Sequence, residues 1–205
     1  MAHGIRLHNH VVAAVLLLTA GLWFSLTEAH AQGLAPTPSA THTAGESRVD
    51  VGALLEKLAQ PDQERWRRIE RQIMREWSRS GSAVVDYLFE RGQQALRAGE
   101  AREAIEHFSA VIDHDPDFPE GWNARASAWF MENRLGLSMG DLEQALARNP
   151  QHFAALAGMG TILEQVGELE RARDAFAAAH ALNPHRPRVR EALDRLDLAL
   201  GGRAL

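Results

Sequence analysis

The chain has 205 residues, of which 45% are hydrophobic and 24% charged, and its formal net charge is −5 at pH 7. This balance is typical of a folded protein, and the negative charge gives no reason to expect a nucleic-acid partner. Cysteine is absent from the sequence, which excludes a disulfide framework, a thiolate nucleophile and a cysteine-based metal site. Sustained strand-type alternation is also missing, so the fold class that we predict is all-α.

Residues 1–31 have the three-part layout of a cleaved secretory signal. Arg6 precedes a continuous apolar run over residues 11–26, and Ala29 and Ala31 occupy the two positions that a signal peptidase reads. The alternative is an uncleaved membrane anchor, because the run is only slightly shorter than the roughly 20 residues that span a bilayer. We favour cleavage after Ala31, which predicts a periplasmic or secreted protein. Without cleavage, the chain would be anchored in the inner membrane.

Two segments separate this signal from the main pattern of the chain. Residues 32–48 are rich in Ala, Pro and Thr with almost no large apolar side chain, which predicts a flexible linker. Residues 49–81 form a predicted helical pair, whose second helix we expect to begin at Pro61 and to end at Gly81. We interpret the pair as a degenerate repeat or as a cap on the exposed face of the first repeat, because array ends need such a cover.

The second helix of this pair is rich in arginine. One interpretation is a basic face that contacts anionic lipid headgroups. The interpretation that we favour is a solvated face on which Glu64, Glu70 and Glu76 offset the positive charge. Membrane contact is therefore the less favoured expectation. The arginines concerned are Arg65, Arg67, Arg68, Arg71, Arg75 and Arg79.

Residues of matched type then recur at a fixed spacing. Pro116, Pro150 and Pro184 lie 34 residues apart, and several other positions keep the same period. Such a period indicates stacked copies of one helical hairpin, in which the proline ends each copy. The sets in step are the small residues Gly92, Ala126 and Gly160, the small residues Ala104, Ser138 and Ala172, and the large residues Phe108, Leu142 and Phe176.

This pattern resembles the tetratricopeptide repeat (TPR) family over three units, residues 85–118, 119–152 and 153–186. The resemblance implies an α-solenoid of helix-turn-helix repeats in a right-handed superhelix, with residues 187–202 as a C-terminal capping helix. The signature positions of the family are filled by Trp122, by Gly92 and Gly160, by Gly99 and Gly167, by Ala104 and Ala172, by Phe108 and Phe176, and by the three prolines.

The middle unit departs most from the family pattern. Asn133 replaces the glycine between its helices, which is a mild change because asparagine tolerates the left-handed conformation. Gly136, Ser138 and Gly140 replace good helix formers. We therefore expect the second helix of this unit to begin late, near Ser138.

No catalytic constellation is found in the sequence. It has no glycine-rich phosphate loop, no serine in a nucleophile-elbow context and no His-Glu-x-x-His zinc motif. Asp113, His114 and Asp115 are interpreted as ordinary helix-end residues, since no second set of ligands shares their spacing. We predict a protein that is not an enzyme, with no cofactor, no metal and no small-molecule substrate.

The TPR resemblance implies that the first helix of each unit lines a concave groove in which a protein or peptide partner binds. Chaperone-adaptor members hold a carboxylate with several basic residues there, but only Arg97 is available, so an apolar groove with a polar rim is expected instead. The alternative is that its apolar members pack against adjacent helices. The predicted groove residues are Phe89, Gln93, Leu96, Arg97, Asn123, Ser127, Phe130, Met131, Thr161 and Glu164.

Together these inferences predict an exported TPR scaffold that mediates protein–protein interaction, acting in the bacterial cell envelope. Two alternatives stay open. The chain could be a structural protein that associates with itself, or a membrane-anchored adaptor that keeps its N-terminal helix. The partner and the oligomeric state do not follow from the sequence.

Overall fold

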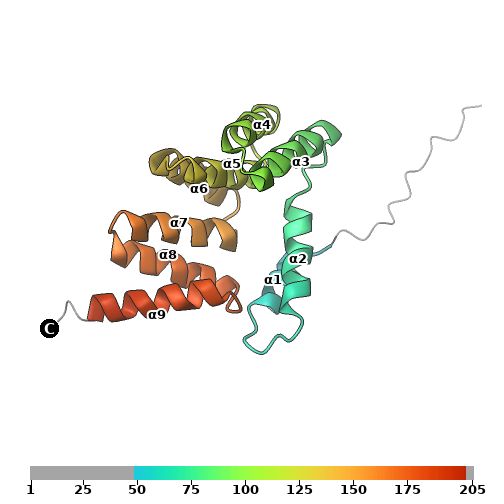
Figure 1. Cartoon of the computed structure of the whole chain (residues 1–205). Helices are drawn as coiled ribbons and strands as arrows, with labels where there is room; N and C mark the ends of the chain where they lie inside the picture. The colour runs from blue at the N-terminus through green and yellow to red at the C-terminus, as the bar shows by residue number, and fades with distance from the viewer. Residues whose placement is uncertain (1–48, 202–205) are drawn as a thin grey trace, which may run out of the picture. The chain divides into compact units, whose positions relative to one another are not determined.

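The structure is a computed structural model that describes residues 49–201. Within this range all regular elements are helices, from α1 to α9, which confirms the predicted all-α fold (Figure 1). The predicted signal with Ala29 and Ala31, and the predicted linker, lie outside the described residues.

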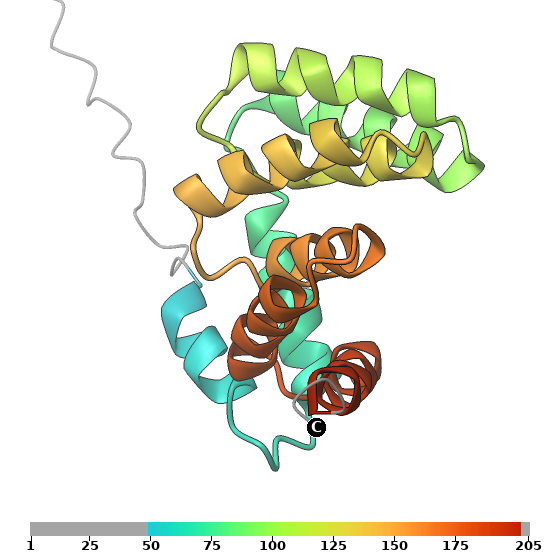
Figure 2. The same cartoon turned by 90° about the vertical axis from the view of Figure 1, so that its left-hand side faces the viewer.

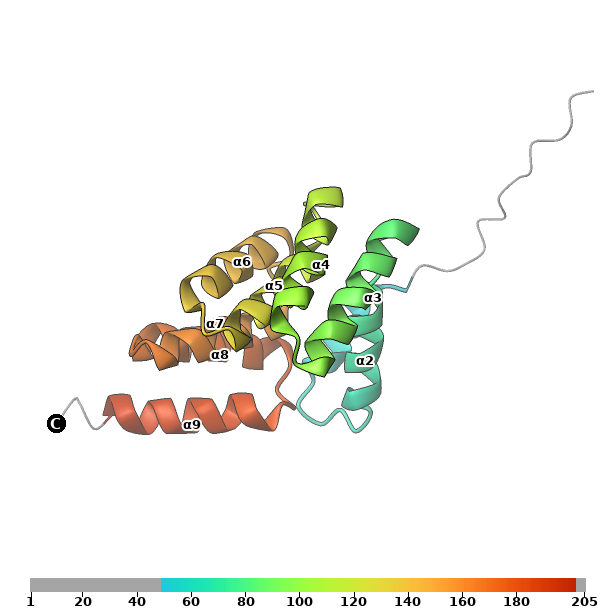
Figure 3. The same cartoon turned by 45° about the horizontal axis from the view of Figure 1, so that its top comes forward.

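Six of the helices form three successive pairs, which Figure 3 shows stacked one after another. We call these pairs the first, second and third unit. The pair α1–α2 comes before them and is called the N-terminal pair, and α9 follows against α8. The bounds are α1 Val51–Leu58, α2 Trp66–Trp77, α3 Ala83–Ala98, α4 Ala101–His114, α5 Pro119–Met131, α6 Leu135–Arg148, α7 Phe153–Gln165, α8 Leu169–Leu182 and α9 Pro187–Gly201.

The turn inside each unit depends on one residue in the left-handed conformation. Gly99 (φ 81°) and Gly167 (φ 87°) have this role in the first and third units, and Asn133 (φ 54°) has it in the second. Glycine adopts a positive φ without a steric penalty, and asparagine is among the few other residues that tolerate it. The expectation for Asn133 is confirmed.

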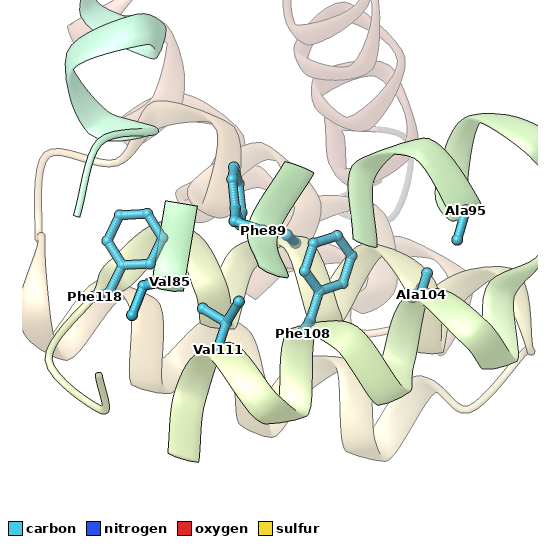
Figure 4. Packing of buried hydrophobic residues seen from close by; sticks show 9 residues of the cluster. Val85, Phe89, Ala95, Ala104, Phe108, Val111 and Phe118 are labelled. Atoms are coloured by element: carbon cyan, nitrogen blue, oxygen red, sulfur yellow. The ribbon is translucent and has the colours of Figure 1, made fainter. Parts of the chain in front are cut away.

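Small residues on the first helix of a unit let a large ring from the second helix approach closely. A Cβ atom added at Gly92 would lie 2.5 Å from the ring of Phe108, and one added at Gly160 would lie 2.9 Å from Phe176. Figure 4 shows Phe108 between α3 and α4, beside Phe89. The repeated small and large positions of the sequence are therefore the two sides of one packing contact.

The second helix of the middle unit begins earlier than expected. α6 starts at Leu135, so the prediction of a late start near Ser138 is wrong. Ser138 is buried and its hydroxyl donates to the carbonyl of Ala126 at 2.7 Å, which fixes this first turn against α5. Tertiary contact here outweighs the weak helix propensity of Gly136 and Gly140.

The N-terminal pair differs from the prediction in its helix boundary. α2 begins at Trp66 instead of Pro61 and ends at Trp77 instead of Gly81, and residues 59–65 form the connection between α1 and α2. The amide of Arg65 donates to the side chain of Gln63 at 3.2 Å, which satisfies this backbone group outside a helix. A hydrogen bond from a nearby side chain to a backbone group often competes with helix formation.

The position of the N-terminal pair also contradicts the prediction. It packs on the third unit, where Leu58 and Ile73 share a buried cluster with Phe153 of α7 (Figures 1 and 2). The outer face of the first unit consequently keeps Val84 and Tyr87 exposed. The expected cover of the first unit was wrong because the apolar side of α2 has a larger set of buried partners on the third.

Polar contacts hold the N-terminal pair at the same place. Arg186 donates to the carboxylate of Glu70 at 2.8 Å, and its guanidinium lies 4.8 Å from the ring centroid of Phe153. The imidazole of His185 lies 3.1 Å from the carbonyl oxygen of Leu58. Since α2 runs directly into α3, the N-terminal pair connects the first unit with the third.

Candidate functional site

A pocket of about 350 Å³ lies between α5 and α6 of the second unit and α7 of the third. Phe130 and Met131 at its edge are 39% and 50% exposed. Aromatic residues and methionine are enriched at protein interfaces, and large apolar side chains that share one hollow are more informative than scattered ones. The pocket is therefore the main candidate for a contact surface in the described chain.

Small residues on α7 make room for this pocket. Ala154 and Gly158 line it together with Ala126 and Leu142, and a Cβ atom added at Gly158 would meet Leu142 at 3.5 Å. The walls are thus mostly apolar, which favours a ligand that buries apolar surface of its own.

Hydroxyl and amide groups surround the apolar walls. Ser127 and Thr161 donate to the carbonyls of Asn123 and Ala157, at 3.1 and 3.0 Å, within their own helices. Their oxygens keep the capacity to accept a further hydrogen bond. Asn123 also lines the pocket and donates to Glu120 at 3.3 Å. This arrangement can bury an apolar side chain of a bound peptide and form hydrogen bonds with the peptide backbone around it.

A second hollow, of about 870 Å³, continues from this pocket towards α9 and shares Ala154, Gly158 and Thr161 with it. Glu164 lies in its wall and accepts two hydrogen bonds from Arg195, both at 2.9 Å. The hydrogen bond to Glu164 raises the pKa of the Arg195 guanidinium above its ordinary value. Glu164 thus joins α7 to α9, and we call the two hollows together the concave trough.

The structure brings together some of the predicted groove residues and separates others. Phe89 is buried in the core of the first unit, with its ring 5.4 Å from Phe118 and 5.6 Å from Phe108, so the prediction of Phe89 as a groove residue is wrong. Leu96 packs against the same core. The predicted groove residues that do line the trough are Asn123, Ser127, Phe130, Met131, Thr161 and Glu164.

Gln93 and Arg97 line a different hollow, of about 840 Å³, which lies between α3 and α2. We call it the arginine cleft, because Arg71, Arg75 and Arg79 line it as well. These three residues belong to the N-terminal pair, which the sequence predicted to be a degenerate repeat or a cap on the first unit. They lie close to Arg97 because the N-terminal pair docks where it does.

A group of three side chains that the sequence did not predict lies where α2, α5 and α7 meet, and two of them, Glu120 and His152, are buried. The Nε2 atom of His152 lies 2.6 Å from Glu120, and its Nδ1 atom accepts a hydrogen bond from the amide of Ala155 at 3.1 Å. Trp77 stacks on the imidazole at 4.6 Å. Because Nδ1 is an acceptor, the ring proton is on Nε2 and is donated to Glu120. His152 precedes α7 as its N-cap, but no spacing rule links it to Trp77.

Residues 49–201 contain no group of three or more His, Asp or Glu side chains arranged to hold a metal ion. None of their helices is both long enough and apolar enough to cross a bilayer.

Two models of the tetratricopeptide repeat family match the chain, one over residues 89–141 and the other over residues 132–196. The chain belongs to the tetratricopeptide repeat family. The matched residues run from within α3 into α9 and cover the three units apart from the first residues of α3. The family and the solenoid fold expected from the sequence are thereby confirmed.

Curated TPR relatives match this chain in part. A TPR repeat-containing protein of Rhizobium etli is 35% identical over 99 residues, which make up 48% of each chain. DnaJ homolog subfamily C member 3 of Mus musculus is 29% identical over 115 residues, which are 56% of this chain and 23% of the mouse protein. The chain thus spans about half or less of the length of these relatives.

Solved structures of other proteins superpose on part of this chain. The first TPR domain of Spaghetti (RPAP3), bound to the HSP90 peptide SRMEEVD, has a TM-score of 0.57 at 26% identity over 58% of this chain and 95% of that domain. The Yersinia enterocolitica type III secretion chaperone SycD, in complex with a peptide of the translocator YopD, has a TM-score of 0.55 at 17% identity. It covers 58% of this chain and 95% of the chaperone chain.

Proposed function

We propose that this chain is a non-enzymatic scaffold that binds a protein or peptide partner in its concave trough. The observation that carries the proposal is the pocket between the second and third units, with Phe130 and Met131 exposed at its edge. Apolar anchors surrounded by hydrogen-bonding groups are the usual composition of a peptide-binding surface. The RPAP3 domain and SycD, which share the fold, were solved with peptides bound.

The test is crosslinking in intact cells, with a photoreactive amino acid placed at Thr161 in the trough. We expect adducts with a partner, and we expect Phe130→Ala combined with Met131→Ala to remove them. Leu137→Ala is the matched control, because Leu137 is a similarly exposed apolar residue that does not line the pocket. Unchanged adducts in the double variant would exclude the trough as the binding surface.

The proposal includes export to the cell envelope. Its support is the apolar run that precedes Ala29 and Ala31, the residues expected at the cleavage site. N-terminal sequencing of the protein purified from the producing cell tests this part. We expect the mature chain to begin at Gln32, and a sequence that reads through Ala31 favours the anchored adaptor instead.

A self-associating structural protein is the second candidate, and the exposed outer face of the first unit favours it. Val84 and Tyr87 lie one helical turn apart on α3 and are 56% and 63% exposed. Light scattering over a hundredfold range of protein concentration separates the two functions. A monomer at all concentrations disfavours self-assembly, whereas association that Tyr87→Glu abolishes supports it.

A further inference from the structure

The arginine cleft gathers positive charge in a protein whose net charge is negative. Arg71 and Arg75 lie one helical turn apart on α2, Arg79 follows the end of that helix, and Arg97 faces them from α3. All four side chains belong to exposed residues. Like charges gathered in one hollow repel each other unless an anion accompanies them.

Two carboxylates, those of Glu70 and Glu120, line the cleft itself, but both are engaged by groups outside it. Glu70 accepts from Arg186 of the third unit at 2.8 Å, and Glu120 is bonded to the buried His152. Glu76 lies 3.4 Å from Arg79, the one ion pair that the described residues form with the four arginines of the cleft. The described part of the chain therefore leaves Arg71, Arg75 and Arg97 without a carboxylate partner.

We propose that the arginine cleft binds an acidic segment of the partner peptide, with neighbouring Asp or Glu side chains placed between α2 and α3. Guanidinium groups bind carboxylates through paired charge-assisted hydrogen bonds, and two walls of arginine suit a chain with successive carboxylates. Gln93 lies in the same wall and can bond the peptide backbone. Because α2 lies outside the three repeats, docking of the N-terminal pair creates this site.

This inference rests on the proposed scaffold function and specifies the chemistry of the partner. The apolar pocket and the arginine cleft are separate hollows, since the residues that line one do not line the other. Variants of one surface can therefore be compared with variants of the other in the same assay.

The test is fluorescence anisotropy on the full chain, with a labelled peptide of four consecutive glutamates and its glutamine counterpart as probes. We expect the glutamate peptide to bind at 50 mM NaCl and to weaken strongly at 500 mM NaCl, because salt screens exposed charges. Arg75→Gln and Arg97→Gln should each lower affinity about fivefold, and the double variant should lower it further.

The control variant is Arg68→Gln, which removes one charge from the same helix outside the cleft and should leave affinity unchanged. Equal binding of the glutamine peptide overturns the proposal. So does an equal loss of affinity with Arg68→Gln. Arginine-dependent sedimentation with phosphatidylglycerol vesicles, without binding of the glutamate peptide, overturns it in favour of a membrane surface.

The crosslinking assay in cells distinguishes failure of this inference from failure of the scaffold function. Adducts that are lost with the Phe130 and Met131 substitutions, but kept with Arg75→Gln and Arg97→Gln together, remove the cleft and leave the scaffold standing. Adducts that survive both sets of substitutions remove the proposed function itself.

Discussion

At the residue scale, Gly92 sets the distance between the two helices of the first unit. Replacing it with alanine would place a Cβ atom 2.5 Å from the ring of Phe108, which is fully buried and has no free space to move into. We expect Gly92→Ala to lower the free energy of unfolding by about 1–3 kcal/mol, measured by urea unfolding, because overpacking a tight core is destabilising.

The control substitution should change the free energy of unfolding in the opposite direction. Gly140 lies inside α6, and a Cβ atom added there would meet nothing within 4 Å. Gly140→Ala should stabilise the protein by up to about 1 kcal/mol through helix propensity alone. Equal effects of the two substitutions would contradict the packing role assigned to Gly92.

A second prediction at this scale concerns the buried pair of Glu120 and His152. Glu120→Ala leaves the Nε2–H group of His152 buried without its acceptor. The expected loss of stability is about 1–3 kcal/mol, the usual penalty for an unsatisfied buried polar group. Thermal unfolding measures this loss. Glu143→Ala is the control, because Glu143 is exposed and its substitution should change stability by no more than about 0.5 kcal/mol.

At the element scale, Phe153 is the main apolar contact between the third unit and the N-terminal pair. It is fully buried and its ring lies 5.1 Å from that of Trp77. Phe153→Ala should cost about 3–5 kcal/mol and release α1 and α2. Hydrogen exchange read by mass spectrometry should show faster exchange in α1 and α2, with α3 and α4 unchanged.

Leu198→Ala is the matched control for this experiment, since Leu198 is a large apolar residue that is 80% exposed on α9. It should change stability by no more than about 0.5 kcal/mol. Slow exchange in α1 and α2 of the Phe153→Ala protein would mean that other contacts suffice to dock the N-terminal pair.

The repeated helices could be predicted because each carries its own apolar period and its own stop signal, as Gly99 and Asn133 show. The start of α6 could not, because a buried hydrogen bond from Ser138 outweighs the local preference of two glycines. Propensity is a weak guide wherever tertiary contacts decide.

The candidate site was predictable only where it lies on the repeats. Phe130 and Met131 line the trough as a family position implied, but Phe89 turned into the core, since Phe108 and Phe118 surround it. The arginine cleft was not predictable. It requires Arg75 and Arg97 to line the same hollow, which depends on how α2 docks, and no period in the sequence relates α2 to the third unit.

At the scale of the whole molecule, the N-terminal pair links the two ends of the array. A simple repeat array unfolds by stages because each unit contacts only its neighbours. Here α2 continues into the first unit while it packs on the third, so we expect one cooperative transition. Fluorescence from the tryptophans of the described residues, Trp66, Trp77, Trp122 and Trp129, and far-ultraviolet circular dichroism should give the same urea midpoint.

Substitution of Ile73 by alanine provides the contrasting case. Ile73 is fully buried between the N-terminal pair and the third unit, and its truncation weakens that contact by about 2–4 kcal/mol. The fluorescence and circular dichroism signals of this variant should then have different urea midpoints. Separate midpoints in the unaltered protein would show that the link does not couple the ends.

The same link limits how this protein can change in length. An open solenoid accepts a duplicated unit, because the extra copy stacks on its neighbour and nothing else has to move. Here Trp77 must reach His152 while its own helix leads straight into α3. A further copy inserted between α3 and α7 would carry these two attachment points apart. A relative with an extra repeat at that place must lack this contact or have moved it.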